Sequence, residues 1–121
     1  MQNNKEFLKS AIELTFIDLD LTFRSMITDR SGSTAIVVIL TPTDYICINL
    51  GDSRCVIDFG NGVIKQTTNH KPELEKERIE NAGGCVVNGR INKNLAVSRA
   101  FGDFHFKDRH DLISRRIFEC F

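Results

Sequence analysis

Several kinds of residue are scarce in this chain, and each scarcity narrows what the protein can be. There is no tryptophan, there are two prolines, and sixteen basic residues balance sixteen acidic ones. Without a positive excess the chain has no electrostatic basis for binding nucleic acid or an anionic membrane, so neither is expected as a partner. No apolar run approaches the roughly 20 residues that span a bilayer. The first residues, MQNNKEF, have no apolar core like that of a signal peptide. These absences favour a protein of the cytoplasm or nucleus.

The four cysteines do not form a metal-binding motif. They stand at Cys47, Cys55, Cys85 and Cys120, with no Cys-x-x-Cys pair and no Cys/His cluster, which disfavours a zinc site. Three of them lie in apolar runs typical of strands, where a free thiol behaves as a small hydrophobic group. We expect reduced cysteines, as in a cytosolic protein, with Cys120 able to crosslink on oxidation. No Ser/His/Asp or Cys/His arrangement in the sequence supports an enzyme that uses a serine or cysteine nucleophile.

What is present is the composition of one ordinary globular domain of 121 residues, 41% of them hydrophobic. Apolar residues at steps of three and four predict a helix over residues 6–27. Its main apolar stripe consists of Leu8, Ile12, Phe16, Leu19, Phe23 and Met26. A second apolar set consists of Phe7, Ala11, Leu14, Leu21 and Ile27. We expect the helix to pack against two partners, a sheet and another helix. Met1, just before this helix, favours a natural translation start.

Four strands are predicted after a loop over residues 29–33. The continuous β-branched run at 34–40 is typical of a strand buried on both faces. Residues 45–50 alternate apolar and polar, as in a half-exposed strand. Residues 54–59 and 63–67 flank a Gly-Asn-Gly turn, a strong hairpin signal. The four strands together predict an antiparallel meander.

The second half predicts smaller elements. Pro72 opens a short charged helix over 73–82, and Glu73, Glu75 and Glu77 favour its N-terminal end. Strands at 85–87 and 90–91 flank an Asn-Gly turn, and a further strand is expected at 95–97. The tail, 104–121, predicts a short amphipathic helix.

Four motifs connect this pattern with a known family. They are Gly51-Asp52-Ser53-Arg54, then Asn69-His70-Lys71-Pro72, then Glu77-Arg78-Ile79-(x3)-Gly83-Gly84, and finally NGRINKNLAVSRAFGD over 88–103. In this order and spacing they resemble the central part of the metal-dependent protein serine/threonine phosphatases of type 2C, the PPM family. The resemblance covers residues 31–103, and the tail at 104–121 resembles nothing specific. It implies that residues 1–121 form a partial domain of that α+β fold. Antiparallel sheets would be flanked by a long N-terminal helix and a short charged helix.

The resemblance also implies a chemistry that this chain carries only in part. Family members hydrolyse phosphoserine and phosphothreonine in phosphoproteins with a water activated by two Mg²⁺ or Mn²⁺ ions. Their carboxylates come from an early Glu-Asp, an Asp-Gly-His-Gly-Gly turn, a late Asp-Gly-x-Trp-Asp and a terminal Asp-Asn, and none of these occurs here. We therefore expect no catalytic residue and no bound metal in this chain. Only Asn69 matches a family metal position, an aspartate of a third, weaker site.

The remaining motif residues are interpreted as scaffold. The amide of Asn69 is a poorer ligand than a carboxylate, so we expect it to form the turn before Pro72. Asp52 and Asp103 follow glycine, and we expect both to accept backbone N–H bonds in turns. Arg54 and Arg99 have the geometry to meet phosphate. In the family pattern the two guanidinium groups donate hydrogen bonds to buried carbonyls or form ion pairs with acids such as Asp52. The scaffold set is Gly51, Asp52, Ser53, Arg54, Ser98, Arg99, Gly102 and Asp103.

Two functional hypotheses remain open at this point. The chain is either a partial phosphatase domain that is inactive on its own, or a non-catalytic pseudophosphatase that acts as a binding or regulatory module. In either case we expect a homo-oligomer, and most simply a symmetric dimer, because unpaired strand edges and apolar surface invite pairing with another copy. The helix at 6–27 or the tail at 104–121 would form the contact.

Overall fold

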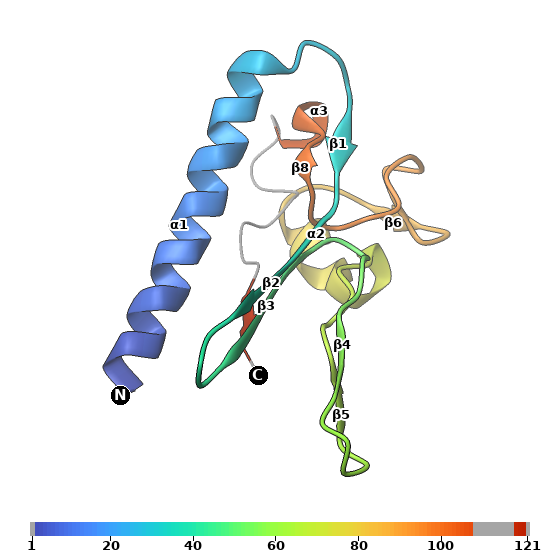
Figure 1. The fold of residues 1–121 in the computed structure, drawn as a ribbon. Helices are drawn as coiled ribbons and strands as arrows, with labels where there is room; N and C mark the ends of the chain where they lie inside the picture. Colours follow the sequence, from blue (N-terminus) through green and yellow to red (C-terminus); the bar gives the residue numbers. More distant parts are fainter. Residues whose placement is uncertain (1, 108–117, 121) are drawn as a thin grey trace.

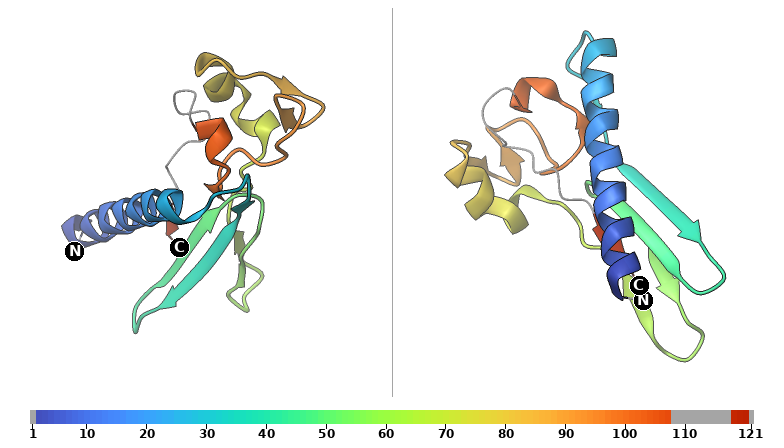
Figure 2. Two further views of the ribbon diagram at one scale, coloured as in Figure 1. Left: turned by 90° about the horizontal axis from the view of Figure 1, so that it is seen from above. Right: turned by 90° about the vertical axis from the view of Figure 1, so that its left-hand side faces the viewer.

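The computed structural model describes residues 2–107 and 118–120. Its architecture is α+β, as the sequence predicts. Helix α1 (Gln2–Met26) lies along one side, and the strands and short helices lie on the other (Figure 1). The two further views show that α1 stands beside the β2–β3 hairpin rather than between layers (Figure 2). No helix in the described part of the chain is both long enough and apolar enough to cross a membrane.

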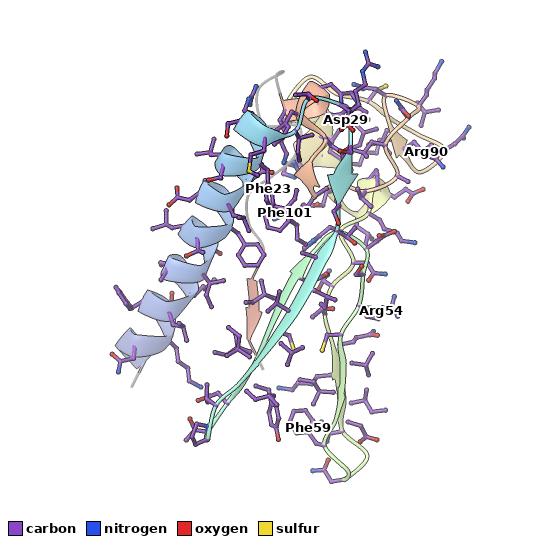
Figure 3. All side chains as sticks on the ribbon, turned by 45° about the horizontal axis from the view of Figure 1, so that its top comes forward. Phe23, Asp29, Arg54, Phe59, Arg90 and Phe101 are labelled. Atoms are coloured by element: carbon purple, nitrogen blue, oxygen red, sulfur yellow. The ribbon has the colours of Figure 1, made fainter. Side chains whose placement is uncertain are left out.

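The main apolar stripe of α1 is what attaches the helix to the rest of the molecule. Ile12 and Phe16 pack against a buried cluster made by one strand, at Ile46, Ile48 and Leu50. About two turns beyond Phe16, Phe23 lies edge-on to Phe101 with ring centroids 5.5 Å apart, and Phe16 stacks on the same ring at 5.3 Å. Figure 3 shows Phe23 and Phe101 pointing toward each other. The predicted helix is confirmed, and it begins at Gln2, before the expected start at residue 6.

Three of the five residues in the second apolar set of α1 remain at the surface, while Ala11 and Ile27 are partly buried. Phe7 is 76% exposed, and Leu14 and Leu21 are exposed as well. In the described residues α1 packs on strands, and it also contacts the short helix α3 (Phe104–Lys107), where Arg24 lies over the Phe104 ring and Lys107 donates to Asp20. Both expected partners, a sheet and another helix, are therefore present, although polar residues of α1 make the contacts with α3.

The largest sheet has the order β2-β3-β9, with both pairings antiparallel. Its strands are β2 (Ala35–Leu40), β3 (Tyr45–Leu50) and β9 (Phe118–Cys120). The register runs from Ala35 opposite Leu50 to Leu40 opposite Tyr45. Because β9 is a strand, the helix expected over 104–121 is wrong at 118–120. Residues 108–117 lie outside the described part.

The burial of β2 and β3 is the reverse of what their patterns predict. β3 is buried at every residue from Ile46 to Leu50, whereas β2 is exposed from Ile36 to Leu40. The sheet order explains this reversal, since β3 lies between two strands and under α1, while β2 is at the edge. A run of β-branched residues indicates a preference for extended backbone and apolar contact. It does not indicate whether the strand lies at the centre or at the edge of the sheet.

The predicted four-stranded meander is also wrong. β4 (Val56–Asp58) and β5 (Ile64–Gln66) pair only with each other in the described residues, so their hairpin forms a separate two-stranded ribbon (Figure 1). It contacts β3 through side chains, and the rings of Phe59 and Tyr45 lie edge to face with centroids 6.4 Å apart. Gly51 adopts a φ of 104°, and an added Cβ there would lie 2.4 Å from the Thr34 side chain. Glycine at this position therefore allows the chain to turn sharply out of β3 beside Thr34.

A short strand pair joins the two ends of the motif region. β1 (Gly32–Ser33) lies in the segment expected to be a loop and pairs antiparallel with β8 (Phe101–Gly102). Gly102 has a φ of 73°, and a Cβ added to it would lie 2.5 Å from the carbonyl oxygen of Ser31. Only glycine allows the two backbones to approach this closely.

A second, smaller core lies beneath the short elements. The helix expected at 73–82 divides into a 3₁₀ helix, η1 (Pro72–Glu75), and helix α2 (Lys76–Asn81). β6 (Val86–Val87) and β7 (Arg90–Ile91) form the predicted hairpin. The strand expected at 95–97 is reduced to one bridge between Leu95 and Ile91. The cluster is formed by Ile79, Ile91 and Phe106, the last from α3 (Phe104–Lys107).

Phe101→Ala should lower the free energy of unfolding by about 2–3 kcal/mol, because it removes the ring that Phe16 and Phe23 both contact. Urea unfolding followed by circular dichroism measures the change. Phe7→Ala removes the same atoms from a side chain that is 76% exposed, so it should alter the value by less than about 0.5 kcal/mol. Equal losses in the two variants would contradict the packing of α1 through Phe101.

Candidate functional site

The motifs that resemble the phosphatase family meet at one place in the structure. The backbone N–H of Gly51 donates to Nδ1 of His70 at 3.0 Å, and the N–H of His70 donates to the carbonyl of Gly51 at 2.8 Å. These reciprocal bonds join the turn after β3 to the turn before Pro72. They also fix Nδ1 of His70 as an acceptor, so this nitrogen is unprotonated in the folded chain.

A third motif attaches through the same histidine. The backbone N–H of Ser98 donates to the carbonyl of His70 at 3.0 Å. Beneath it, buried Asn49 donates its amide to the carbonyls of Thr68 at 2.8 Å and Gly51 at 3.3 Å. Most of these hydrogen bonds use backbone groups. They therefore hold the three segments together whichever side chains the segments expose to solvent.

Arg54 and Asn69 face each other across this junction. Nε of Arg54 donates to Oδ1 of Asn69 at 3.4 Å, and Nη1 donates to Oε1 of Gln66 at 3.3 Å. Arg54 lies at the base of the β4–β5 hairpin (Figure 3). The Asn69 oxygen is the atom that would bind a metal at this position, and a guanidinium already occupies its lone-pair side. A cation placed there would meet electrostatic repulsion from Arg54.

The strongest polar cluster is centred on Glu75, at the end of η1. Its carboxylate forms ion pairs with Arg99 and with Arg78, and it accepts a hydrogen bond from Oγ of Ser98 at 2.5 Å. Arg78 also donates from Nη2 to the carbonyl of Ser98 at 2.9 Å. Burial on its own would raise the pKa of Glu75, but the hydrogen bonds from Arg99, Ser98 and Arg78 prevail and lower this pKa to about 2.

Glu75 is the residue that sequence reasoning missed. It was interpreted as one of three glutamates favouring a helix N-terminus, and nothing in their spacing shows which one turns inward. Arg99 was interpreted as structural with Asp52 as an example of a partner, and the acid that receives it is Glu75. Asp52 itself is exposed.

Asp103 is a buried turn residue. Its φ is 49°, its N–H donates to the carbonyl of Ser31, and its own carbonyl accepts from the N–H of Phe106. Burial raises the pKa of its carboxyl group, while the charges of His105 and Lys107 oppose that shift. An added Cβ on Gly32 would lie 2.2 Å from the Asp103 carboxylate, so the acid is packed directly on this backbone.

Asp20 connects α1 to the same segment. Its Oδ1 accepts from the N–H of Gly102 at 2.9 Å, and its Oδ2 accepts from Nζ of Lys107 at 2.6 Å. Lys107 donates in addition to the carbonyl of Ala100 at 2.9 Å. Asp20 stabilises the 98–103 motif from the helix side.

These side chains do not form a site for a divalent metal. Hard cations need several carboxylate or carbonyl oxygens directed at one point. In the described part of the chain, no three His, Cys, Asp or Glu side chains are grouped so that they could hold an ion. The acids of the motifs are directed at arginines or at backbone, or they lie apart on the surface.

Comparison with known proteins supports the family resemblance. Residues 1–118 match the model of the family described as Protein phosphatase 2C, so the match extends beyond 31–103 to α1 and most of the tail. The chain is 49% identical over 106 residues to Protein phosphatase ppm-1.A of Caenorhabditis elegans, covering 85% of this chain and 22% of that protein. It is 43% identical over 114 residues to Protein phosphatase 1B of Rattus norvegicus, covering 88% of this chain and 29% of the relative. Human Protein phosphatase 1A is 46% identical over 112 residues, with 87% and 29% covered. The chain thus spans less than a third of each relative.

Glu75→Gln should destabilise the fold most at neutral pH. Because the pKa of Glu75 is about 2 in the fold against an ordinary 4.5, the ionised carboxylate stabilises the fold above pH 4.5. That contribution is lost as the pH falls from 4.5 toward 2. It amounts to about 2 kcal/mol after allowance for solvent screening. The measurement is urea unfolding between pH 2.5 and 7.

The matched control is Glu77→Gln, which neutralises an exposed glutamate two residues away. The difference between wild type and Glu75→Gln should shrink toward zero at the acid end, while Glu77→Gln should follow wild type throughout. A Glu75→Gln deficit that does not depend on pH would show that the carboxylate charge contributes nothing.

Proposed function

The chain belongs to the protein phosphatase 2C family, and we propose that it forms part of the scaffold of a metal-dependent protein serine/threonine phosphatase domain, without hydrolytic activity of its own. The proposal is supported chiefly by one observation. The polar groups of the family motifs are bonded to one another, through the reciprocal hydrogen bonds between Gly51 and His70 and through the Glu75 cluster. Groups engaged in this way are suited to positioning loops.

The missing chemistry supports the same proposal. A two-metal phosphatase needs carboxylates that bridge the ions and a water between them. None of the family's four acidic motifs occurs in the sequence, and the one matched metal position, Asn69, directs its oxygen at Arg54. The relatives named above are more than three times as long as the matched segment. In a longer protein, carboxylates outside these 121 residues would hold Mg²⁺ or Mn²⁺, and these ions would bind the phosphate of a phosphoprotein substrate.

The alternative function is a non-catalytic pseudophosphatase that acts by binding. One observation favours it, namely the amount of apolar surface left exposed on β2 and on the outer side of α1. In the described residues β2 has a neighbouring strand on one side only, and its run AIVVIL contains no charge that would discourage further pairing. The β2 edge of a second copy of the chain can pair with this edge, since antiparallel pairing about a twofold axis satisfies the backbone hydrogen bonds of both strands.

The purified chain should not hydrolyse p-nitrophenyl phosphate in millimolar Mn²⁺ above the rate of a blank without protein. Asn69→Asp should not restore activity, because one added carboxylate beside Arg54 does not make a metal cage. Colorimetric release of p-nitrophenol measures the rate. Turnover that is abolished by a chelator and reduced by Asp52→Asn or Asp103→Asn would overturn the proposal, because it would place the activity in this chain.

The chain should be a dimer at micromolar concentration. The contact proposed here is the β2 edge, in place of the helix or tail expected from the sequence, because β2 is exposed and has a neighbouring strand on one side only in the described residues. Val38→Lys places a charge on an exposed position of this strand and should convert the dimer to a monomer, as measured by light scattering after size-exclusion chromatography. Leu74→Lys makes the same change at a 68% exposed position of η1 and should leave the dimer intact. A wild-type monomer with cooperative unfolding would contradict this prediction.

A further inference from the structure

Two cysteines that are separate in the sequence come into contact in the fold. Sγ of Cys47 lies 3.3 Å from Sγ of Cys55, eight residues later in the chain. Cys47 belongs to β3 and has no exposed surface, whereas Cys55, just before β4, is partly exposed. Neither the phosphatase chemistry nor the scaffold bonds described above involve these two thiols.

The contact follows from the geometry of β3. Ile46, Ile48 and Leu50 face α1, so the alternation of side chains along a strand places Cys47 on the opposite face. The chain turns after Leu50 and passes under this face, which brings Cys55 against it. Thr67 then holds Cys55 in place, because its Oγ1 accepts from the N–H of Cys55 at 3.0 Å and its own N–H donates to the Cys55 carbonyl at 3.0 Å.

We propose that Cys47 and Cys55 are a peroxide-sensitive thiol pair, which forms a disulfide between β3 and the β4–β5 hairpin. Sulfur atoms in a disulfide lie about 2.0 Å apart, so from 3.3 Å they need to approach by little more than an ångström. Small side-chain rotations within the existing backbone bring about such an approach. The pair is therefore assembled by the fold before any oxidant arrives.

The reaction balances with hydrogen peroxide as the oxidant. The Cys55 thiolate, which solvent reaches, attacks one peroxide oxygen, so that an S–O bond forms, the O–O bond breaks and water leaves after protonation. The sulfur of Cys47 then attacks the sulfenic acid at Cys55, forming the S–S bond and breaking the S–O bond. The thiol proton of Cys47 leaves in the second water. Two thiols and one peroxide thus give one disulfide and two waters.

The position of this bond gives it a structural effect on the family motif. The loop that it closes contains Gly51, Asp52, Ser53 and Arg54. Gly51 is bonded to His70, and Arg54 to Asn69, so the disulfide would restrain both turns at the motif junction. It would also restrict the unfolded chain, which is the main way a disulfide stabilises a protein. The proposal does not depend on whether the chain hydrolyses phosphate.

Peptide mapping of the wild-type chain tests the inference directly. The protein is treated with hydrogen peroxide, quenched with catalase, unfolded, alkylated with N-ethylmaleimide and digested with trypsin under non-reducing conditions. Trypsin cleaves after Arg54, between the two cysteines, so the disulfide would hold two peptides together. We expect a mass equal to the two peptides less two hydrogens, loss of alkylation at both cysteines, and recovery of both after dithiothreitol. The denaturation midpoint of the oxidised chain should shift upward, and dithiothreitol should reverse the shift.

Two serine variants provide the matched comparison. Cys55→Ser should abolish the linked peptides and the shift in midpoint, while Cys47 becomes available to alkylation on unfolding. Cys85→Ser changes an exposed thiol elsewhere and should leave both intact. If Cys47 and Cys55 both stay alkylatable at a peroxide concentration that oxidises Cys85, the proposal fails. It fails equally if the linked peptides join either residue to Cys85 or Cys120 instead.

Discussion

The carboxylate of Glu75 is the constraint on which the motif region depends. A partly buried acid without partners would be protonated or would avoid the interior, because its charge loses solvation. Here it accepts bonds from Arg78, three residues along, and from Ser98 and Arg99, more than twenty residues away. The carboxylate therefore links η1 and α2 to the segment that runs into β8. The His70 junction, one bond further along at Ser98, is positioned by the same cluster.

An element of this fold can be predicted from the sequence when residues close to it in the chain determine its structure. The long helix, the Gly60-Asn61-Gly62 turn and the Asn88-Gly89 hairpin were all predictable, because each depends on neighbouring residues. The order of the strands is a different matter, since β9 comes from the far end of the chain to pair with β3. Once β9 and α1 cover β3, the hydrophobic run in β2 is left at the edge. No pattern inside either strand contains that information.

In the candidate site, too, local features were predictable and contacts between distant segments were not. The motif residues Gly51, Arg54, Ser98 and Arg99 were predicted as scaffold from their resemblance to a family, and the hydrogen bonds described for them above join them to other parts of the chain. Which acid receives Arg99 was not predictable, because three glutamates stand at equal spacing over η1 and the first turn of α2, and the choice depends on the three-dimensional path of the chain. The contact between Cys47 and Cys55 was hidden for the same reason. Side chains on different elements meet only after the turn between them has set its direction.

The attachment of α1 has a consequence for how the protein folds during synthesis. The bonds from Asp20 to Gly102 and Lys107 span 82 and 87 residues, and Phe101 supplies the aromatic contacts of the helix. At a ribosomal rate of about 5–20 residues per second, the helix leaves the ribosome several seconds before Phe101, Gly102 and Lys107. Ile12 and Phe16 can pack on β3 once that strand has emerged, but Asp20 and Phe23 have no native partner until the later segment arrives, and contacts so distant in sequence form slowly. The first element made is therefore among the last to complete its docking.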